Sequence, residues 1–277
     1  MNIFKKLFGV SQESKAQTPV DKAAEDSRNF DILKYDGVKA LNAGRNDYAL
    51  ECFERALGIR EDLEIHDYMS RACIALGDLP DAYRHLQKLA DARPDNINIF
   101  LRMAHVAYMM EDYVVMGTAC EKALLIDKDS CEALCLYARS CKGTGDSSNA
   151  VAMLTKAVSL NDEYADAYLL RGEISLADGN LETAGEDAAW LLGHFPENED
   201  ALMLQAKIEL AHNSYAVAIR FLDGVIDANP FRQEAYSLRG EARRNAGDEE
   251  GAKADLEYAA ELQTGSHGDN SKGVEAG

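Results

Sequence analysis

The sequence predicts an all-α fold, an α-solenoid built from seven helix-turn-helix copies of about 34 residues each. Three observations lead to this fold class: a regular spacing along the chain, a small residue at one fixed place in every copy, and alanine at a second fixed place. The first spacing is 33 residues and the other five are 34. Such spacing indicates a repeat protein, in which each copy packs on its neighbours. The copies begin at Phe30, Leu63, Ile97, Cys131, Ala165, Glu199 and Gln233.

The two helices of each copy are predicted from two places that carry small residues. Small residues that face each other allow two helices to approach closely. Alanine occupies the twentieth place in every copy except the third, which has Met116. The eighth place, in the first helix, holds Gly37, Ser70, Ala104, Ala138, Gly172, Ala206 and Gly240. The twentieth place, in the second helix, holds Ala49, Ala82, Ala150, Ala184, Ala218 and Ala252.

Turn signals separate the helices within a copy and end the copies. Glycine adopts the left-handed conformation that ends a helix, and Asp or Asn then accepts from the free N–H groups of the next helix. Proline near the end of a copy stops the second helix because it has no N–H group. The turn signals are Gly77-Asp78, Gly145-Asp146, Gly179-Asn180 and Gly247-Asp248, and the prolines are Pro94, Pro196 and Pro230.

These places resemble the pattern of the tetratricopeptide repeat family, which has a small eighth residue, alanine at the twentieth place and proline near the thirty-second. The match covers roughly 233 of the 277 residues, and the segment from Ala235 to Gly240 fits it closely. The resemblance implies a right-handed solenoid that binds other proteins. The third copy departs from the pattern, because it lacks the turn glycine and has Met116 and Cys120 at core places. We expect the family geometry to be disturbed there.

Composition and charge agree with one elongated helical domain. No apolar run approaches the roughly 20 residues that a membrane-spanning helix needs. The net charge of −19 argues against nucleic acid as a partner, because phosphate recognition depends on clustered Lys and Arg. The excess of acidic residues is typical of a solvated helix surface.

The cysteines predict a reducing compartment and no bound metal. They do not alternate as a disulfide framework does, so we expect reduced thiols in a cytoplasmic protein. Cys131 and Cys135 lie one helical turn apart, and His105 lies on the matching helix of the preceding copy, which is compatible with a soft metal site. Packing as small apolar side chains explains the same residues. We therefore predict no metal and no cofactor. The cysteines are Cys52, Cys73, Cys120, Cys131, Cys135 and Cys141.

The segments outside the copies are predicted to be short. Residues 1–29 are expected to form a short amphipathic start and a flexible linker, residues 30–263 the seven-copy solenoid, and residues 264–277 a disordered tail. The start is too short for a secretory signal. It can contact an anionic membrane surface or a partner groove, or it can fray or fold back on the first copy. Its apolar face holds Ile3, Phe4, Leu7 and Phe8, with Lys5 and Lys6 beside it.

A comparison among the copies predicts two buried ion pairs. Arginine occupies the seventh place only in the copies that have aspartate at the twenty-third place. We predict that Arg171 pairs with Asp187 and that Arg239 pairs with Asp255. A partly buried charge is normally retained by its partner. Each pair is therefore expected to join the two helices of its copy.

The resemblance implies that the first helices line a concave groove, and we place the binding site there. The groove places combine a basic row with an apolar row, which predicts a partner peptide or protein segment with apolar and acidic side chains. The alternative is that Asp166, Glu173 and Asp200 neutralise the bases while the apolar residues fill contacts between copies. The basic residues are Arg71, Arg102, His105, Arg139, Lys142 and Lys207, and the apolar residues are Leu101, Cys135, Leu169 and Met203.

The predicted function is that of a non-catalytic protein-interaction scaffold. The sequence contains no phosphate-binding glycine loop, no paired zinc-ligand motif and no nucleophile elbow. His85, His194, His212 and His267 have no nucleophile or orienting carboxylate at a diagnostic spacing. The sequence leaves the oligomeric state open. The alternative function is a membrane-recruited assembly factor, in which residues 1–9 are the tether and the copies are the scaffold.

Overall fold

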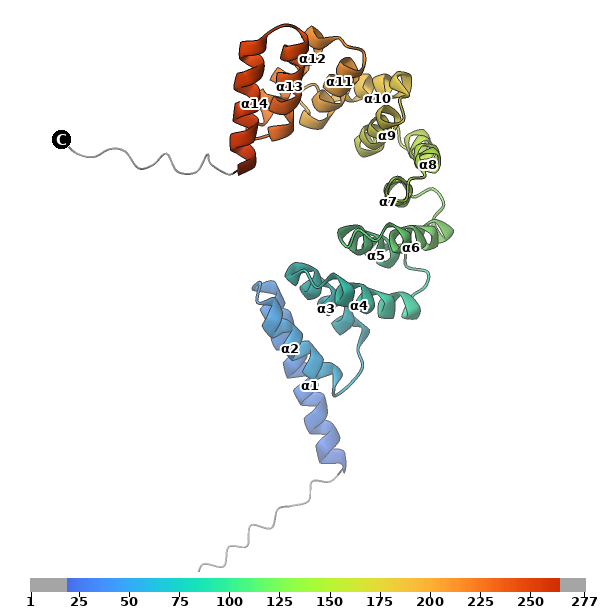
Figure 1. The fold of residues 1–277 in the computed structure, drawn as a ribbon. Helices are drawn as coiled ribbons and strands as arrows, with labels where there is room; N and C mark the ends of the chain where they lie inside the picture. Colours follow the sequence, from blue (N-terminus) through green and yellow to red (C-terminus); the bar gives the residue numbers. More distant parts are fainter. Residues whose placement is uncertain (1–18, 265–277) are drawn as a thin grey trace, which may run out of the picture. The chain divides into compact units, whose positions relative to one another are not determined.

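The computed structural model describes residues 19–264, and all regular structure in this part of the chain is α-helical (Figure 1). This confirms the predicted fold class, because each copy contributes two helices. The helices are α1 Pro19–Asn42, α2 Asn46–Leu57, α3 Leu63–Leu76, α4 Leu79–Ala92, α5 Ile97–Met109, α6 Tyr113–Ile126, α7 Cys131–Gly143, α8 Ser147–Leu160, α9 Ala165–Ala177, α10 Leu181–His194, α11 Glu199–Ala211, α12 Tyr215–Ala228, α13 Gln233–Asn245 and α14 Glu249–Thr264.

The substantial helix contacts in residues 19–264 are between near neighbours in the sequence. The two helices of each copy form a hairpin, and in most copies the second helix also packs on the first helix of the next copy. First helices also contact one another between successive copies, as α5 contacts α7 and α9 contacts α11. This contact pattern is that of a repeat array, whose core is shared between adjacent copies.

The contacts divide the chain into two compact units. The first unit extends to Pro94 and contains the first two copies, and the second begins at Asp95 and contains the other five. The sequence predicts one elongated domain, because its spacing continues through Pro94 without a break. The regular spacing does not reveal how strongly adjacent copies adhere, which depends on the side chains between them.

The first helix begins earlier than predicted. Residues 19–29, expected to belong to a flexible linker, are helical, because α1 starts at Pro19. Proline is well suited to the first turn of a helix, and Ala23, Ala24 and Glu25 favour helix without needing an apolar stripe. The predicted amphipathic start at Met1–Gly9 lies outside the described residues, as do residues 265–277 of the predicted tail.

The small eighth places are explained by close packing. Ser70 is fully buried, and Ala104, Ala138 and Ala206 are fully buried at the same place in later copies. A Cβ added to Gly172 would lie 2.6 Å from Leu204 Cδ2 and 3.2 Å from Asp187 Cβ. The neighbouring side chains therefore occupy the space that a larger eighth residue would need.

All seven hairpin turns contain a residue in the left-handed conformation. Five of these residues are glycine, and the other two are Glu111 at φ 57° and Asn213 at φ 58°. The third copy therefore keeps its hairpin although it lacks the turn glycine, and α5 packs on α6 as in the other copies. Contrary to expectation, the disturbance is confined to the backbone strain at Glu111, which costs roughly 1–2 kcal/mol in a residue with a Cβ.

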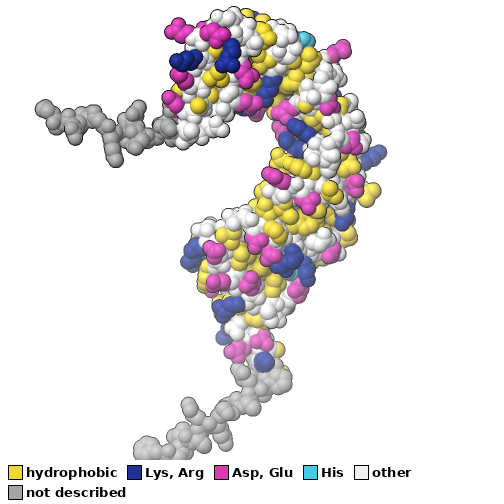
Figure 2. All heavy atoms as spheres, in the orientation of Figure 1, with side chains coloured by type: hydrophobic (Ala, Val, Ile, Leu, Met, Phe, Trp, Pro, Cys, Tyr) yellow, Lys and Arg dark blue, Asp and Glu magenta, His cyan; other side chains and the backbone are white. Residues whose placement is uncertain are grey.

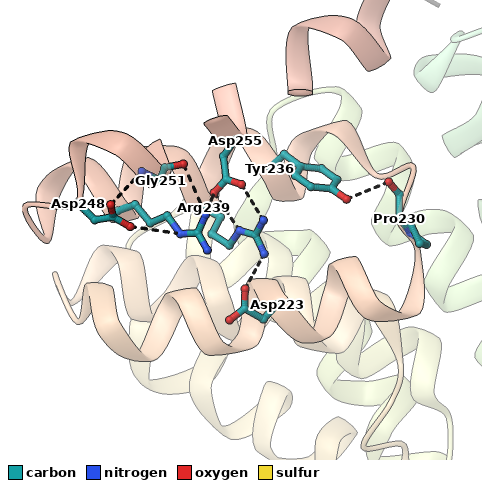
Figure 3. Close-up of polar contacts among 8 residues, drawn as sticks. Asp223, Pro230, Tyr236, Arg239, Asp248, Gly251 and Asp255 are labelled. Carbon is teal, nitrogen blue, oxygen red and sulfur yellow. Dashed lines mark hydrogen bonds and ion pairs between the residues drawn. The ribbon is translucent and has the colours of Figure 1, made fainter. Parts of the chain in front are cut away.

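Both predicted ion pairs are confirmed. Arg171 Nη2 lies 2.7 Å from Asp187 Oδ1, and Arg239 Nη2 lies 2.7 Å from Asp255 Oδ1. Figure 3 shows the second of these pairs. Asp187 is 1% exposed. Burial raises the pKa of Asp187 although Arg171 donates two hydrogen bonds to it. The ion pair with each arginine thus offsets part of the free-energy cost of burying the aspartate carboxylate away from water.

The same arginines also reach the preceding copy. Arg239 Nη1 donates to Asp223 Oδ1 at 2.6 Å, and Arg171 Nη1 donates to Thr155 Oγ1 at 3.2 Å. In the last copy Arg243 adds a second pair to Asp255 at 2.8 Å. These contacts connect consecutive copies as well as the helices within a copy.

A buried histidine pair joins α3 to α4 in the first unit. His66 Nδ1 and His85 Nδ1 lie 2.8 Å apart, and the two residues are 4% and 2% exposed. His66 Nε2 donates to the Glu61 carboxylate at 2.7 Å. His85 Nε2 has no hydrogen-bond partner among the described residues. The two ring nitrogens of His85 cannot both donate a proton to an acceptor, because Nε2 has no partner among the described residues and Nδ1 faces the His66 imidazole.

We expect the first unit to lose stability in mild acid because of this pair. Burial and the nearby charges of Arg84, His66 and Lys88 lower the pKa of His85 to about 4, against the opposing effect of Asp81. The unfolded chain then binds more protons between pH 6.5 and 4, so the free energy of unfolding falls as the pH falls through this range. The loss between pH 7.5 and pH 5 is about 2 kcal/mol.

Urea unfolding of the full chain at several pH values measures this loss. Amide exchange in α3 and α4 is the readout for the first unit. His85→Gln keeps a group that can donate to His66 but does not titrate, so it removes this part of the acid sensitivity. An unchanged pH dependence in the variant would contradict the assignment to His85.

Candidate functional site

A hollow of about 330 Å³ in the second unit is lined by the first helices of three successive copies. Lys142 comes from the last turn of α7, Glu173 from α9, and Lys207 from α11, while Arg232 directly precedes α13. The first helices, where the sequence predicts a groove, therefore supply most of its lining. Its lining is Lys142, Glu173, Leu176, Ala177, Asp200, Met203, Leu204, Lys207 and Arg232.

The repeat spacing positions these side chains. Met203 and Lys207 lie one turn apart on α11, and Lys207 occupies the ninth place of its copy. Asn198 caps α11 by accepting from Ala201 N at 2.9 Å, which fixes where the helix begins. The structure thus brings together three of the predicted groove residues, Lys142, Met203 and Lys207.

Three bases of the predicted groove pair with acids from the next copy. His105 Nε2 lies 3.3 Å from Glu132, and Lys207 Nζ lies 2.7 Å from Glu234. His105 and Lys207 each occupy the ninth place of a copy, and each pairs with the glutamate at the second place of the following copy. This match between adjacent copies was not part of the sequence prediction. Lys142 Nζ lies 3.2 Å from Glu173 Oε2. Figure 2 shows acidic and basic side chains interspersed on the visible face of the second unit.

Of the three predicted neutralising acids, one pairs with a predicted groove base. Glu173 pairs with Lys142. Asp200 pairs instead with Arg232, at 2.7 Å, and Glu199 contacts the same guanidinium. Arg232 was not predicted because it occupies the last place of the sixth copy, in the loop before α13 and outside the first-helix places. Asp166 makes no ion pair with the described residues.

Arg139 differs from the other bases of the second unit. It lies half-buried on α7 and makes no hydrogen bond or ion pair with the described residues. The Arg139 guanidinium is therefore available to attract an anion. Arg139 lies on the same helix as Lys142. Arg102, half-buried on α5, has polar contacts of its own. Arg71 is exposed on α3 of the first unit.

Most of the apolar row is buried. Leu101 and Cys135 are each 6% exposed, and Met203 is 3% exposed. Leu169 is half-buried and packs against the core around Tyr168. Of these four side chains, only Met203 also lines the hollow.

Burial keeps the thiols of Cys120 and Cys135 neutral. Burial raises the pKa of Cys135 and of Cys120 to about 12. The half-buried Cys131 donates to the Ala157 carbonyl at 3.7 Å. Within residues 19–264, no group of three or more His, Cys, Asp or Glu side chains is arranged to hold a metal ion.

None of the helices in residues 19–264 is long and apolar enough to cross a lipid bilayer.

Comparison with known proteins finds a family model that matches the C-terminal half of the described chain. The family model described as tetratricopeptide repeat matches residues 138–189, 186–232 and 203–267. A crystal structure of a tetratricopeptide repeat protein from Parabacteroides merdae superposes with a TM-score of 0.71 at 15% identity, and covers 85% of this chain and 93% of that protein. The structure of YrrB, a tetratricopeptide repeat protein, superposes with a TM-score of 0.52 at 14% identity, over 65% of this chain and 92% of YrrB.

The curated relatives are longer proteins. DnaJ homolog subfamily C member 3 of Homo sapiens is 27% identical over 221 residues, which are 74% of this chain and 37% of the relative. This chain therefore spans little more than a third of that relative's length. The family model, the shared fold and the paired helices of every described copy agree with the pattern found in the sequence. Residues 138–267 of the chain match the tetratricopeptide repeat model, and its described helices have the fold of solved tetratricopeptide repeat proteins.

Proposed function

We propose that this protein is a non-catalytic interaction scaffold that binds a partner peptide or protein segment in the groove of its second unit. The observation that carries the proposal is the hollow between α7, α9 and α11, which combines lysine side chains with the apolar surface of Leu176, Ala177 and Leu204. A solved protein of the same fold, YrrB, is described as having an unusual peptide-binding site.

The charges of the groove favour a partner with acidic and apolar side chains. Arg139 has no anionic partner among the described residues, so an incoming carboxylate gains an attraction without breaking an existing pair. Lys142 and Lys207 are paired with Glu173 and Glu234 but are 46% and 37% exposed at their side chains. Exposed ion pairs contribute little, roughly 0–1 kcal/mol, so a partner carboxylate can replace one of them at small cost.

The test is a capture experiment from the lysate of the host with two matched variants. Arg139→Glu combined with Lys207→Glu reverses two groove charges. Lys122→Glu combined with Lys128→Glu makes the same charge change on α6 and the loop after it. We expect wild type and the control to retain a common partner that the groove variant loses by at least tenfold.

Mass spectrometry identifies the retained protein, and a peptide array of its sequence shows which segment binds. Circular dichroism and urea unfolding establish that both variants are folded. A partner retained equally by the groove variant would place recognition elsewhere and contradict the proposal. Binding segments without acidic residues would contradict the predicted partner chemistry.

A further inference from the structure

A second hollow, of about 420 Å³, lies in the second unit beside α12. It is formed by the loop between α10 and α11, by Leu202 of α11 and by the last turns of α12. None of its residues lines the groove hollow. Its lining is Pro196, Glu197, Leu202, Gly224, Asp227 and Ala228.

The floor of this hollow is open because Gly224 has no side chain. A Cβ added there would lie 3.4 Å from Leu202 Cδ1, which is an ordinary contact. The packing of α11 on α12 therefore does not require glycine, in contrast to Gly172. Glycine inside a helix costs about 1 kcal/mol relative to alanine. The missing side chain leaves apolar surface of Leu202 and Ala228 accessible from outside.

Two carboxylates without partners flank this apolar floor. Glu197 and Asp227 are exposed, and neither makes a hydrogen bond or ion pair with the described residues. No lysine or arginine lines the hollow. The acids of the groove hollow differ, because Glu173 and Asp200 are both paired with bases. The local field is therefore negative, and a cation placed here meets no competing internal base.

Exposed aromatic side chains adjoin the hollow along the chain. Phe195 directly precedes Pro196 and is 45% exposed, and Phe231 follows shortly after Ala228 and is 72% exposed. Phe195 also contacts the ring of Trp190, with centroids 6.3 Å apart. Exposed aromatic residues next to an apolar hollow are typical of interaction sites.

We propose that this second hollow binds a short segment of another protein in which an aromatic or leucine side chain lies beside lysine or arginine. The apolar side chain fills the space over Gly224, and the base lies between Glu197 and Asp227. This chemistry is opposite in charge to that of the groove. The two sites share α11, since Leu202 lines one hollow while Met203 and Lys207 line the other.

The probe is a synthetic, fluorescein-labelled peptide with the sequence Gly-Ser-Leu-Lys-Lys-Phe-Ser-Gly, which combines apolar side chains with two lysines. A control peptide replaces both lysines by glutamate. Fluorescence anisotropy measures binding to the full chain. In parallel, unlabelled peptide is titrated against the intrinsic emission of Trp190, which is the single tryptophan of the chain and lies against Phe195.

We expect the lysine peptide to bind wild type and the Arg139→Glu, Lys207→Glu groove variant alike. Binding should weaken at least tenfold in Gly224→Leu, whose side chain occupies the hollow, and in Glu197→Gln combined with Asp227→Asn. Gly224→Ala is the matched control, because it adds helix propensity, fills little of the hollow and should retain binding. Trp190 emission should change only where the peptide binds.

Three results would overturn the proposal: no binding of the lysine peptide to wild type, equal binding of the glutamate peptide, or equal binding to the carboxamide variant. If Gly224→Leu fails to fold, the carboxamide variant decides alone, since both replaced residues are exposed. Because the groove variant is tested with the same peptide, failure of this proposal and failure of the groove proposal are distinguishable.

Discussion

Arg171→Met is expected to destabilise the second unit by about 3–5 kcal/mol at neutral pH, because it leaves the Asp187 carboxylate buried without its partner. Asp187 is 1% exposed, so water cannot replace the lost guanidinium. The carboxylate also receives two hydrogen bonds from Arg171, both of which are lost. Urea unfolding followed by the fluorescence of Trp190, on the same helix as Asp187, measures the change.

The pH dependence and a double variant test the cause of this loss. The pKa of Asp187 is already raised by burial, and removal of Arg171 raises it further. A folded-state pKa above the unfolded value means that stability falls as the pH rises through the interval between them. The variant should therefore lose less stability at pH 5 than at pH 7.5. Arg171→Met combined with Asp187→Leu should be close to wild type. Equal instability of the single and double variants would refute the explanation.

Phe53→Ala is expected to destabilise the first unit by about 3–5 kcal/mol. Phe53 is fully buried on α2, and its ring stacks on Tyr68 of α3 with centroids 5.6 Å apart. It also fills the space beside Gly37, where an added Cβ would lie 2.5 Å from Cε1 of the ring. Truncation to alanine leaves a cavity where three helices meet.

Gly37→Ala provides a control whose effect changes sign. In wild type it should destabilise the first unit, because the added methyl group overlaps the Phe53 ring. The free-energy cost of this overlap exceeds the free energy gained from the higher helix propensity of alanine. In the Phe53→Ala background the same change should stabilise, because the ring is gone. Amide exchange in α1–α4 measures both effects, with α9–α12 of the second unit as an internal reference. Gly37→Ala with the same effect in both backgrounds would show that the ring does not occupy this space.

Most of the helical framework could be predicted from the sequence because its causes are local and recur in every copy. The eighth place, the turn signals and the Arg171–Asp187 match each lie within one copy, so comparison of the copies reveals them. The division after Pro94 could not be predicted, because it depends on packing between copies that otherwise follow the same pattern. The start of α1 was misplaced since residues 19–29 have no apolar stripe, and charged, alanine-rich sequence suits an exposed helix as well as a linker.

The candidate site was predicted only in part. Lys142, Met203 and Lys207 do line one hollow. The burial of Leu101 and Cys135 was not apparent, because an apolar residue at a groove place can either face solvent or pack on the next copy. The pairing of Lys207 with Glu234 involves the second place of the following copy, so it is visible only when adjacent copies are compared. Arg232 occupies the last place of the sixth copy, in a loop for which the repeat pattern makes no prediction.

The restriction of helix contacts to near neighbours has a consequence for synthesis on the ribosome. Every substantial contact between helices in the described chain joins an element to the next one or the one after it. Contacts that are close in sequence close short loops, and proteins rich in such contacts fold quickly. Each hairpin can therefore pack as soon as the following helix has emerged, without waiting for the C-terminal copies. The first unit can complete its core while the second is still being translated.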